Sequence, residues 1–99
     1  MAYKRIKEIR MEVFEYAREN SASERFLDWR LNNPEGFVVN YKGKNNAMLH
    51  RAKCGHFEFK RKVNLAASQK ACSLDRKQVE EWASSEGISQ LKLCSDCSL

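Results

Sequence analysis

The chain has 99 residues, with 18 Lys and Arg against 13 Asp and Glu, and therefore a net charge of +5. At 42% hydrophobic and 31% charged residues, it is too apolar for a disordered tail and too polar for a membrane protein. This length fits a single domain over residues 1–99 with a thin core, which argues against a multidomain enzyme. The four Cys and two His are the most informative residues.

The N-terminal third is predicted to contain two helices. Apolar residues recur at helical spacing in residues 3–19, which predicts an amphipathic helix formed around Ile6, Ile9, Val13 and Ala17. A second helix is expected to begin after Ser21, which has capping-box spacing to Glu24, and to end before Pro34. We expect residues 1–23 to be a helical extension of a zinc-binding α+β module over residues 24–99.

A β-hairpin is the clearest element in the middle of the chain. Residues 37–41 are rich in β-branched and aromatic side chains, residues 43–46 favour a turn, and residues 47–51 supply the partner strand. Residues 57–59 are expected to form a short third strand, and residues 60–71 a loop or an irregular strand.

The C-terminal third is predicted to contain one helix over residues 74–85. Ser73 is expected to cap its start, and Gly87 suits the left-handed position just past its end. Residues 88–93 should return as an extended segment. The expected fold class is therefore α+β, with N-terminal helices, a small antiparallel sheet and a helix around a zinc knuckle.

The Cys and His residues suggest a metal site. Cys94 and Cys97 have the C-x-x-C spacing of a zinc knuckle, while a redox pair of this spacing would open a helix within a βαβ unit. No signal peptide or membrane span is evident, so we expect a cytoplasmic protein whose thiols stay reduced. Cys54 is the third expected ligand.

The fourth ligand is left open among His50, His56 and Cys72. For Cys72 alone, a small buried apolar role is favoured, and such a role is the general alternative for all four cysteines. We expect one structural zinc per chain. The apparent free energy of zinc binding in finger peptides is about 10–16 kcal/mol, whereas the free energy of unfolding of a whole domain is about 5–15 kcal/mol. Four protein ligands leave no open position for hydrolysis.

Two resemblances rest on these residues. The pattern from His50 to Cys54, then residues 73–87, then residues 94–97 resembles the Ada-type metal-binding domain of DNA-alkylation repair. This resemblance implies that His50 is the fourth ligand. The motifs in residues 26–29, 33–40 and 49–54 are similar to an uncharacterised module of bacterial restriction and defence proteins. That module also has a Cys at the place of Cys72 and a Trp-Ala pair, here residues 82–83, which leaves a four-Cys site open. Residues 1–23 have no counterpart in either family, and no methyl-accepting Cys is carried over.

The positive charge is concentrated in one part of the chain. Residues 31–62 contain seven basic and two acidic residues, whereas the flanking parts are almost neutral. Such a patch suits a phosphate backbone, although it also suits a solvated face. The candidate nucleic-acid contacts are Lys42, Lys44, Arg51, Lys53, Lys60, Arg61 and Lys62.

The expected function is that of a non-enzymatic zinc-binding protein that binds nucleic acid through this patch. The resemblances imply a DNA-related or defence context in a bacterium or phage. The alternative is a protein-interaction adaptor or inhibitor with a structural zinc site. A nuclease or other hydrolase is not expected, because the sequence has no HNH-type ligand set and no Gly-rich phosphate loop.

Overall fold

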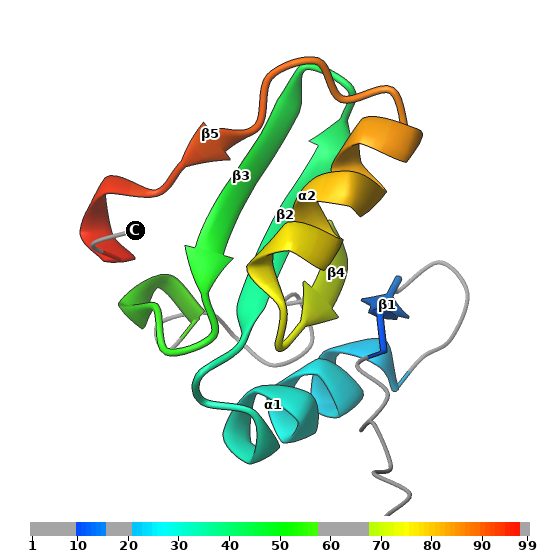
Figure 1. Cartoon of the computed structure of the whole chain (residues 1–99). Coiled ribbons are helices and arrows are strands. Elements are labelled where there is room, and N and C mark those ends of the chain that lie inside the picture. Colours follow the sequence, from blue (N-terminus) through cyan, green and yellow to red (C-terminus); the bar gives the residue numbers. More distant parts are fainter. Residues whose placement is uncertain (1–9, 16–20, 58–67, 98–99) are drawn as a thin grey trace, which may run out of the picture.

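A computed structural model describes residues 10–15, 21–57 (apart from the side chain of His56) and 68–97. These residues form two helices and a five-stranded mixed sheet of strand order β1-β4-β2-β3-β5, so the α+β class is confirmed (Figure 1). The elements are β1 (Glu12–Phe14), α1 (Ala22–Asn32), β2 (Phe37–Gly43), β3 (Asn46–Arg51), β4 (Gln69–Ser73), α2 (Arg76–Ser85) and β5 (Lys92–Leu93), with short 3-10 turns at Gly55–Phe57 and Ser95–Cys97.

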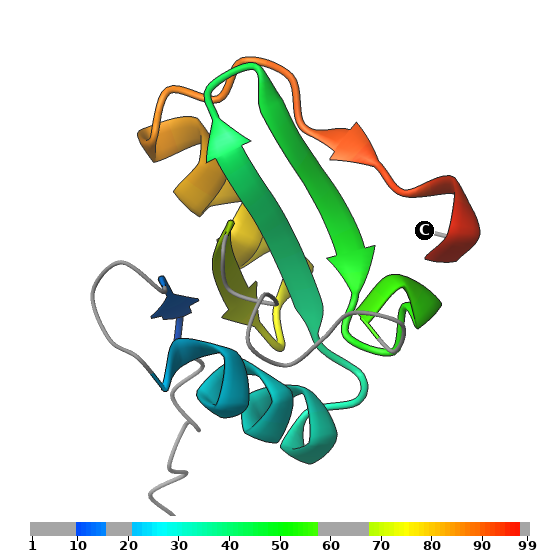
Figure 2. The same ribbon diagram turned by 180° about the vertical axis from the view of Figure 1, so that it is seen from behind.

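The two helices pack against opposite faces of the sheet. Since side chains alternate along a strand, Val38 and Val39 point to different faces and belong to different apolar clusters. Val39 packs with Val79 and Ala83 of α2, which covers the front of β2 and β4 in Figure 1. Val38 packs on the other side with Phe26 of α1. Figure 2 shows α1 lying across the end of the sheet where β2 begins and β3 ends.

The hairpin and the second predicted helix are confirmed. β2 and β3 pair antiparallel from Phe37–Arg51 to Gly43–Asn46. Helix α1 begins after Ser21 and ends before Pro34, as its sequence signals predict, but the Ser21 side chain makes no capping hydrogen bond. Neither helix in the described part of the chain is long and apolar enough to cross a membrane.

The prediction of a helix over residues 3–19 is wrong at residues 12–14, which form β1 and pair antiparallel with β4. In the strand, Phe14 is buried whereas Val13 is 44% exposed. The predicted apolar stripe therefore placed the wrong residue in the core. Residues 3–9 and 16–19 of the predicted helix lie outside the described residues, as does most of the proposed helical extension.

The prediction of a loop or irregular strand over residues 60–71 misses β4. This strand lies between β1 and β2, and Lys70 to Ser73 are all buried. Residues 60–67 lie outside the described part. Phe57, the first residue of the predicted third strand, belongs to a 3-10 turn, and residues 58–59 are not described.

Helix α2 begins two residues later than the sequence predicts. The helix begins at Arg76, because Ser73 still belongs to β4 and Asp75 is the N-cap, whose side chain accepts a hydrogen bond from the Lys77 amide. Gly87 has the expected left-handed conformation, with φ of +82°. Of the extended segment expected at residues 88–93, the last two residues form β5, which runs parallel to β3 and makes the sheet mixed rather than antiparallel.

Candidate metal centre

Four buried side chains meet beside the end of β3. They are His50, Cys54, Cys94 and Cys97, and their candidate ligand atoms all lie within 4.8 Å of one another. Each of the four residues is at most 8% exposed. The arrangement brings together residues that are far apart in the chain and is compatible with a metal site.

The end of the hairpin positions the first two donors. His50 is the penultimate residue of β3 and shares the α1 face of the sheet with its cross-strand partner Val38, because paired residues point to the same side. A tight turn follows, in which the Cys54 amide donates to the Arg51 carbonyl at 3.0 Å. The Cys54 carbonyl then accepts from the Phe57 amide at 3.1 Å. This turn brings the Cys54 sulfur back beside the imidazole.

Strand β5 delivers the other two donors. It pairs parallel with β3 through Leu49 and Leu93, and the Cys94 amide continues this pairing by donating to the Leu49 carbonyl at 2.9 Å. The 3-10 turn Ser95–Cys97 then reverses the chain, so that Cys97 faces the same site. Figure 1 shows the C-terminal turn (red) and the segment after β3 (green) at the same edge of the sheet.

The interatomic distances are compatible with a bound metal ion and do not match a disulfide. The sulfurs of Cys54 and Cys94 are 3.9 Å apart, whereas a disulfide bond measures about 2.05 Å. Two thiolates on one tetrahedral zinc, with Zn–S bonds of about 2.3 Å, lie about 3.8 Å apart. The Cys97 sulfur and His50 Nδ1 are also 3.9 Å apart. Nδ1 is therefore the imidazole nitrogen that faces the Cys97 sulfur.

Without a metal ion, the cluster favours protonated thiols. Burial raises the pKa of the Cys97 thiol to about 12, and the neighbouring thiols of Cys54 and Cys94 add to the rise. Deprotonation of these thiols is therefore unfavourable when no cation is bound. A bound divalent cation inverts this preference, because a coordinating thiol loses its proton outright.

Two arginines and one aromatic ring surround the cluster. Arg51 Nε donates to the Cys97 carbonyl at 3.0 Å. Arg30, from α1, donates to the carbonyls of Ala52 and Cys54. The Phe57 ring meets the His50 imidazole edge-on, with 5.1 Å between centroids. The sequence signals did not identify the roles of Arg30 and Phe57, since neither has a recognisable spacing to the C-x-x-C motif.

Cys72, one of the three candidates for the fourth position, lies elsewhere. Val38 in β2 pairs with His50 on one side and with Cys72 on the other. Neighbouring strands are about 4.8 Å apart, so the backbones of His50 and Cys72 are separated by about 10 Å. Burial raises the pKa of the Cys72 thiol well above its ordinary value. The side chain of His56, the remaining candidate, is outside the described residues.

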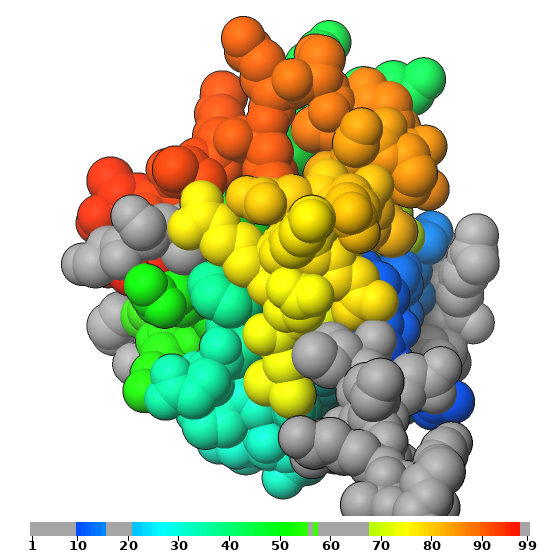
Figure 3. Space-filling view, viewed as in Figure 1, coloured from blue at the N-terminus to red at the C-terminus, as the bar shows by residue number. Residues whose placement is uncertain are grey.

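The four candidate nucleic-acid residues that the structure describes lie at two ends of the hairpin and do not form one patch. Lys42 and Lys44 are exposed at the turn of the hairpin, and Lys44 lies against Gly87. Figure 3 shows this turn (green) next to the segment after α2 (orange). Arg51 and Lys53 belong to the opposite end of the hairpin, about 20 Å away along the strands.

The residues at that second end already have partners. Besides its bond to Cys97, the Arg51 guanidinium lies 5.8 Å from the centre of the Phe37 ring. Lys53 is exposed and pairs with Glu35 at 3.2 Å. The other three candidates, Lys60, Arg61 and Lys62, lie outside the described residues.

Comparison of the chain with protein-family models, curated proteins and solved structures finds no match.

Proposed function

We propose that this protein is a zinc-binding module in which His50, Cys54, Cys94 and Cys97 hold one Zn²⁺ with a structural role. The observation that carries this proposal is the convergence of three sulfurs and one imidazole nitrogen within 4.8 Å inside the protein. Thiolate and imidazole are the donors that zinc prefers, whereas magnesium, calcium and manganese favour oxygen donors.

The donor count and the burial support a structural rather than a catalytic ion. A catalytic zinc keeps one position open for water or substrate, and four protein ligands fill the tetrahedral shell. The low exposure of all four residues also leaves a substrate little access to the ion. Under this assignment, the ion itself has no open position for hydrolysis, which supports the proposal of a non-enzymatic role.

Elemental analysis of the purified chain tests the proposal. We expect one zinc per chain in the wild type and loss of zinc in both His50→Ala and Cys94→Ser. Cys72→Ser is the matched control, because it removes a buried thiol outside the cluster, and it should keep its zinc. A wild-type chain without bound metal, prepared under reducing conditions with zinc present, would overturn the proposal. Zinc retained in His50→Ala would overturn the assignment of His50.

A second proposed function is binding of a nucleic-acid backbone, in the DNA-related context that the sequence resemblances imply. It is supported by the excess of basic residues in residues 31–62 and by the exposure of Lys42 and Lys44 at the hairpin turn. Contacts with phosphates are sequence-independent and weaken with salt. Because Arg51 and Lys53 have partners within the protein, the contacts proposed here are Lys42, Lys44, Lys60, Arg61 and Lys62.

Fluorescence anisotropy with duplex DNA and with single-stranded RNA measures this binding. If three or four of these residues contact phosphates of duplex DNA at a time, the affinity should fall with a log–log salt slope of about −3 to −4. Neutralising Lys42 and Lys44, or the three residues 60–62, should weaken binding to every sequence alike. Lys77→Met, on the exposed side of α2, is the control. Equal affinity in all variants would contradict this second function.

A further inference from the structure

Arg51 connects the two parts of the candidate metal centre. Its backbone lies between His50 and Cys54, whereas its side chain reaches the C-terminal turn, where Nε donates to the carbonyl of Cys97 at 3.0 Å. The side chain is half-buried and lies over the Phe37 ring. Arg51 thus joins the two ligand segments by a direct hydrogen bond between residues that are 46 positions apart in the chain.

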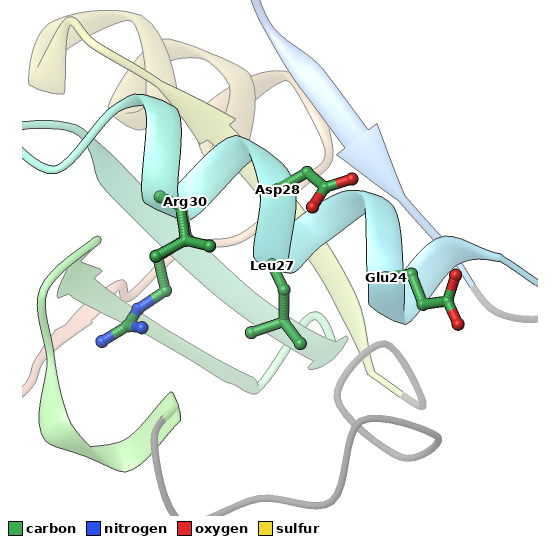
Figure 4. A pocket seen from close by; sticks show the side chains of 5 residues that line it. Glu24, Leu27, Asp28 and Arg30 are labelled. Carbon is green, nitrogen blue, oxygen red and sulfur yellow. The ribbon is translucent and has the colours of Figure 1, made fainter.

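Arg30 makes a similar connection from α1. Figure 4 shows its side chain extending from the helix toward the segment that follows β3. There Nε donates to the Ala52 carbonyl and Nη2 donates to the Cys54 carbonyl at 3.4 Å. The guanidinium also lies 5.9 Å from the centre of the Phe57 ring, which packs against His50. Arg30 therefore holds the Cys54 turn to the helix.

We propose that Arg51 and Arg30 are positioning residues of the metal centre: they hold the backbones of the two ligand segments in the binding geometry before the ion arrives. This inference rests on the proposed zinc site. A flexible ligand segment loses conformational entropy when the ion orders it, and a segment already held in place loses less. Partners outside the ligand shell therefore contribute to metal affinity.

The charge of the loaded site adds to the effect. One Zn²⁺ with three thiolates and a neutral imidazole has a net charge of −1, so two guanidinium groups on the backbone of its ligands are favourably placed. Arg51 accordingly has an internal role in place of the phosphate contact expected from the sequence.

Zinc affinity and release rate test the inference. Chelator competition and transfer of zinc to a chromogenic chelator would be compared for the wild type, Arg51→Met, Arg51→Lys, Arg30→Met and Lys53→Met. Removing either arginine should weaken zinc binding about 10- to 100-fold and speed its release. Arg51→Lys keeps the charge and one donor and should recover part of the loss. Lys53→Met removes a cation beside Cys54 whose partner is the exposed Glu35, and it should change affinity less than about threefold.

The Co²⁺ spectrum separates positioning from ligation. At saturating Co²⁺, both arginine variants should give the same tetrahedral thiolate spectrum as the wild type, because no ligand has been removed. Wild-type affinity in both Arg51→Met and Arg30→Met would overturn the inference while leaving the zinc site intact. An equal loss in Lys53→Met would also overturn it, since charge alone would then explain the effect. Absence of metal from the wild type would instead refute the zinc site itself. Should Arg51→Met fail to fold, Arg51→Lys and Arg30→Met supply the same comparison.

Discussion

The four cysteines occupy two different environments. Cys54, Cys94 and Cys97 converge on His50, whereas Cys72 is fully buried in β4 with Val38 between it and the imidazole. Sequence spacing indicated the C-x-x-C pair and its partner Cys54, but it left the fourth donor open. That choice depends on strand order, because an intervening strand separates Cys72 from the cluster, and strand order is not encoded in local spacing.

The raised pKa of Cys72 predicts a specific loss of stability at alkaline pH. Burial favours the neutral thiol in the folded protein, whereas in the unfolded chain the thiol titrates near its ordinary pKa of about 8.5. A group with a raised folded-state pKa contributes stability below the unfolded pKa and loses it as the pH rises. The free energy of unfolding, measured in urea between pH 7.5 and 9.5, should therefore fall less steeply for Cys72→Ala than for the wild type. Parallel pH profiles would contradict this prediction.

At the level of elements, α1 and the hairpin could be predicted because their signals are local. Ser21 and Pro34 bracket α1, and the aromatic and β-branched run at residues 37–41 lies within β2. β1 and β4 could not be predicted in this way. Gln69–Ser73 lacks β-branched residues, and it forms a strand because it pairs with β1 on one side and β2 on the other. Tertiary pairing thus overrides weak local propensity.

The turn between α1 and β2 depends on the small size of Gly36. A Cβ atom there would lie 2.5 Å from the Trp29 ring and 3.2 Å from the Ser73 carbonyl oxygen. The Gly36 carbonyl also accepts from the Ala52 amide at 2.9 Å, next to the Cys54 turn. Gly36→Ala should therefore lower the free energy of unfolding by about 1–3 kcal/mol, the usual cost of overpacking.

Gly43 provides the matched control for that substitution. A Cβ atom at this position would meet nothing within 4 Å. Gly43→Ala should change the free energy of unfolding by less than about 0.5 kcal/mol, as surface substitutions usually do. Urea denaturation of both variants compares them directly. An equal effect at the two positions would show that the contacts with Trp29 and Ser73 do not limit the turn.

At the scale of the whole molecule, the two apolar clusters differ in their relation to the metal centre. The cluster under α2 contains none of the four donors, whereas the cluster on the α1 face includes Cys54, Cys94 and Cys97. The C-terminal strand β5 pairs with β3 through only two residues. The chain after Ile88 is therefore held to the sheet by a short ladder, by the apolar packing of Leu91, Cys94 and Cys97, by the Arg51 bond and by the proposed ion.

Removal of zinc should accordingly loosen one part of the protein more than the other. A chelator should lower the thermal midpoint of unfolding by about 10–20 °C. This is the shift expected for a domain of this size when it loses a ligand whose concentration was far above the dissociation constant.

Hydrogen exchange should rise first in residues 91–97 and in the turn at residues 52–57, because the Cys94–Leu49 hydrogen bond and the Cys54 turn lose their common anchor. The amides of α2 should keep their protection, since Val79 and Ala83 pack against Val39 away from the donors. Re-addition of zinc is the control and should restore the original exchange pattern. Uniform exchange over both regions would show instead that the ion holds the entire fold, and an unchanged midpoint would show that it holds neither part.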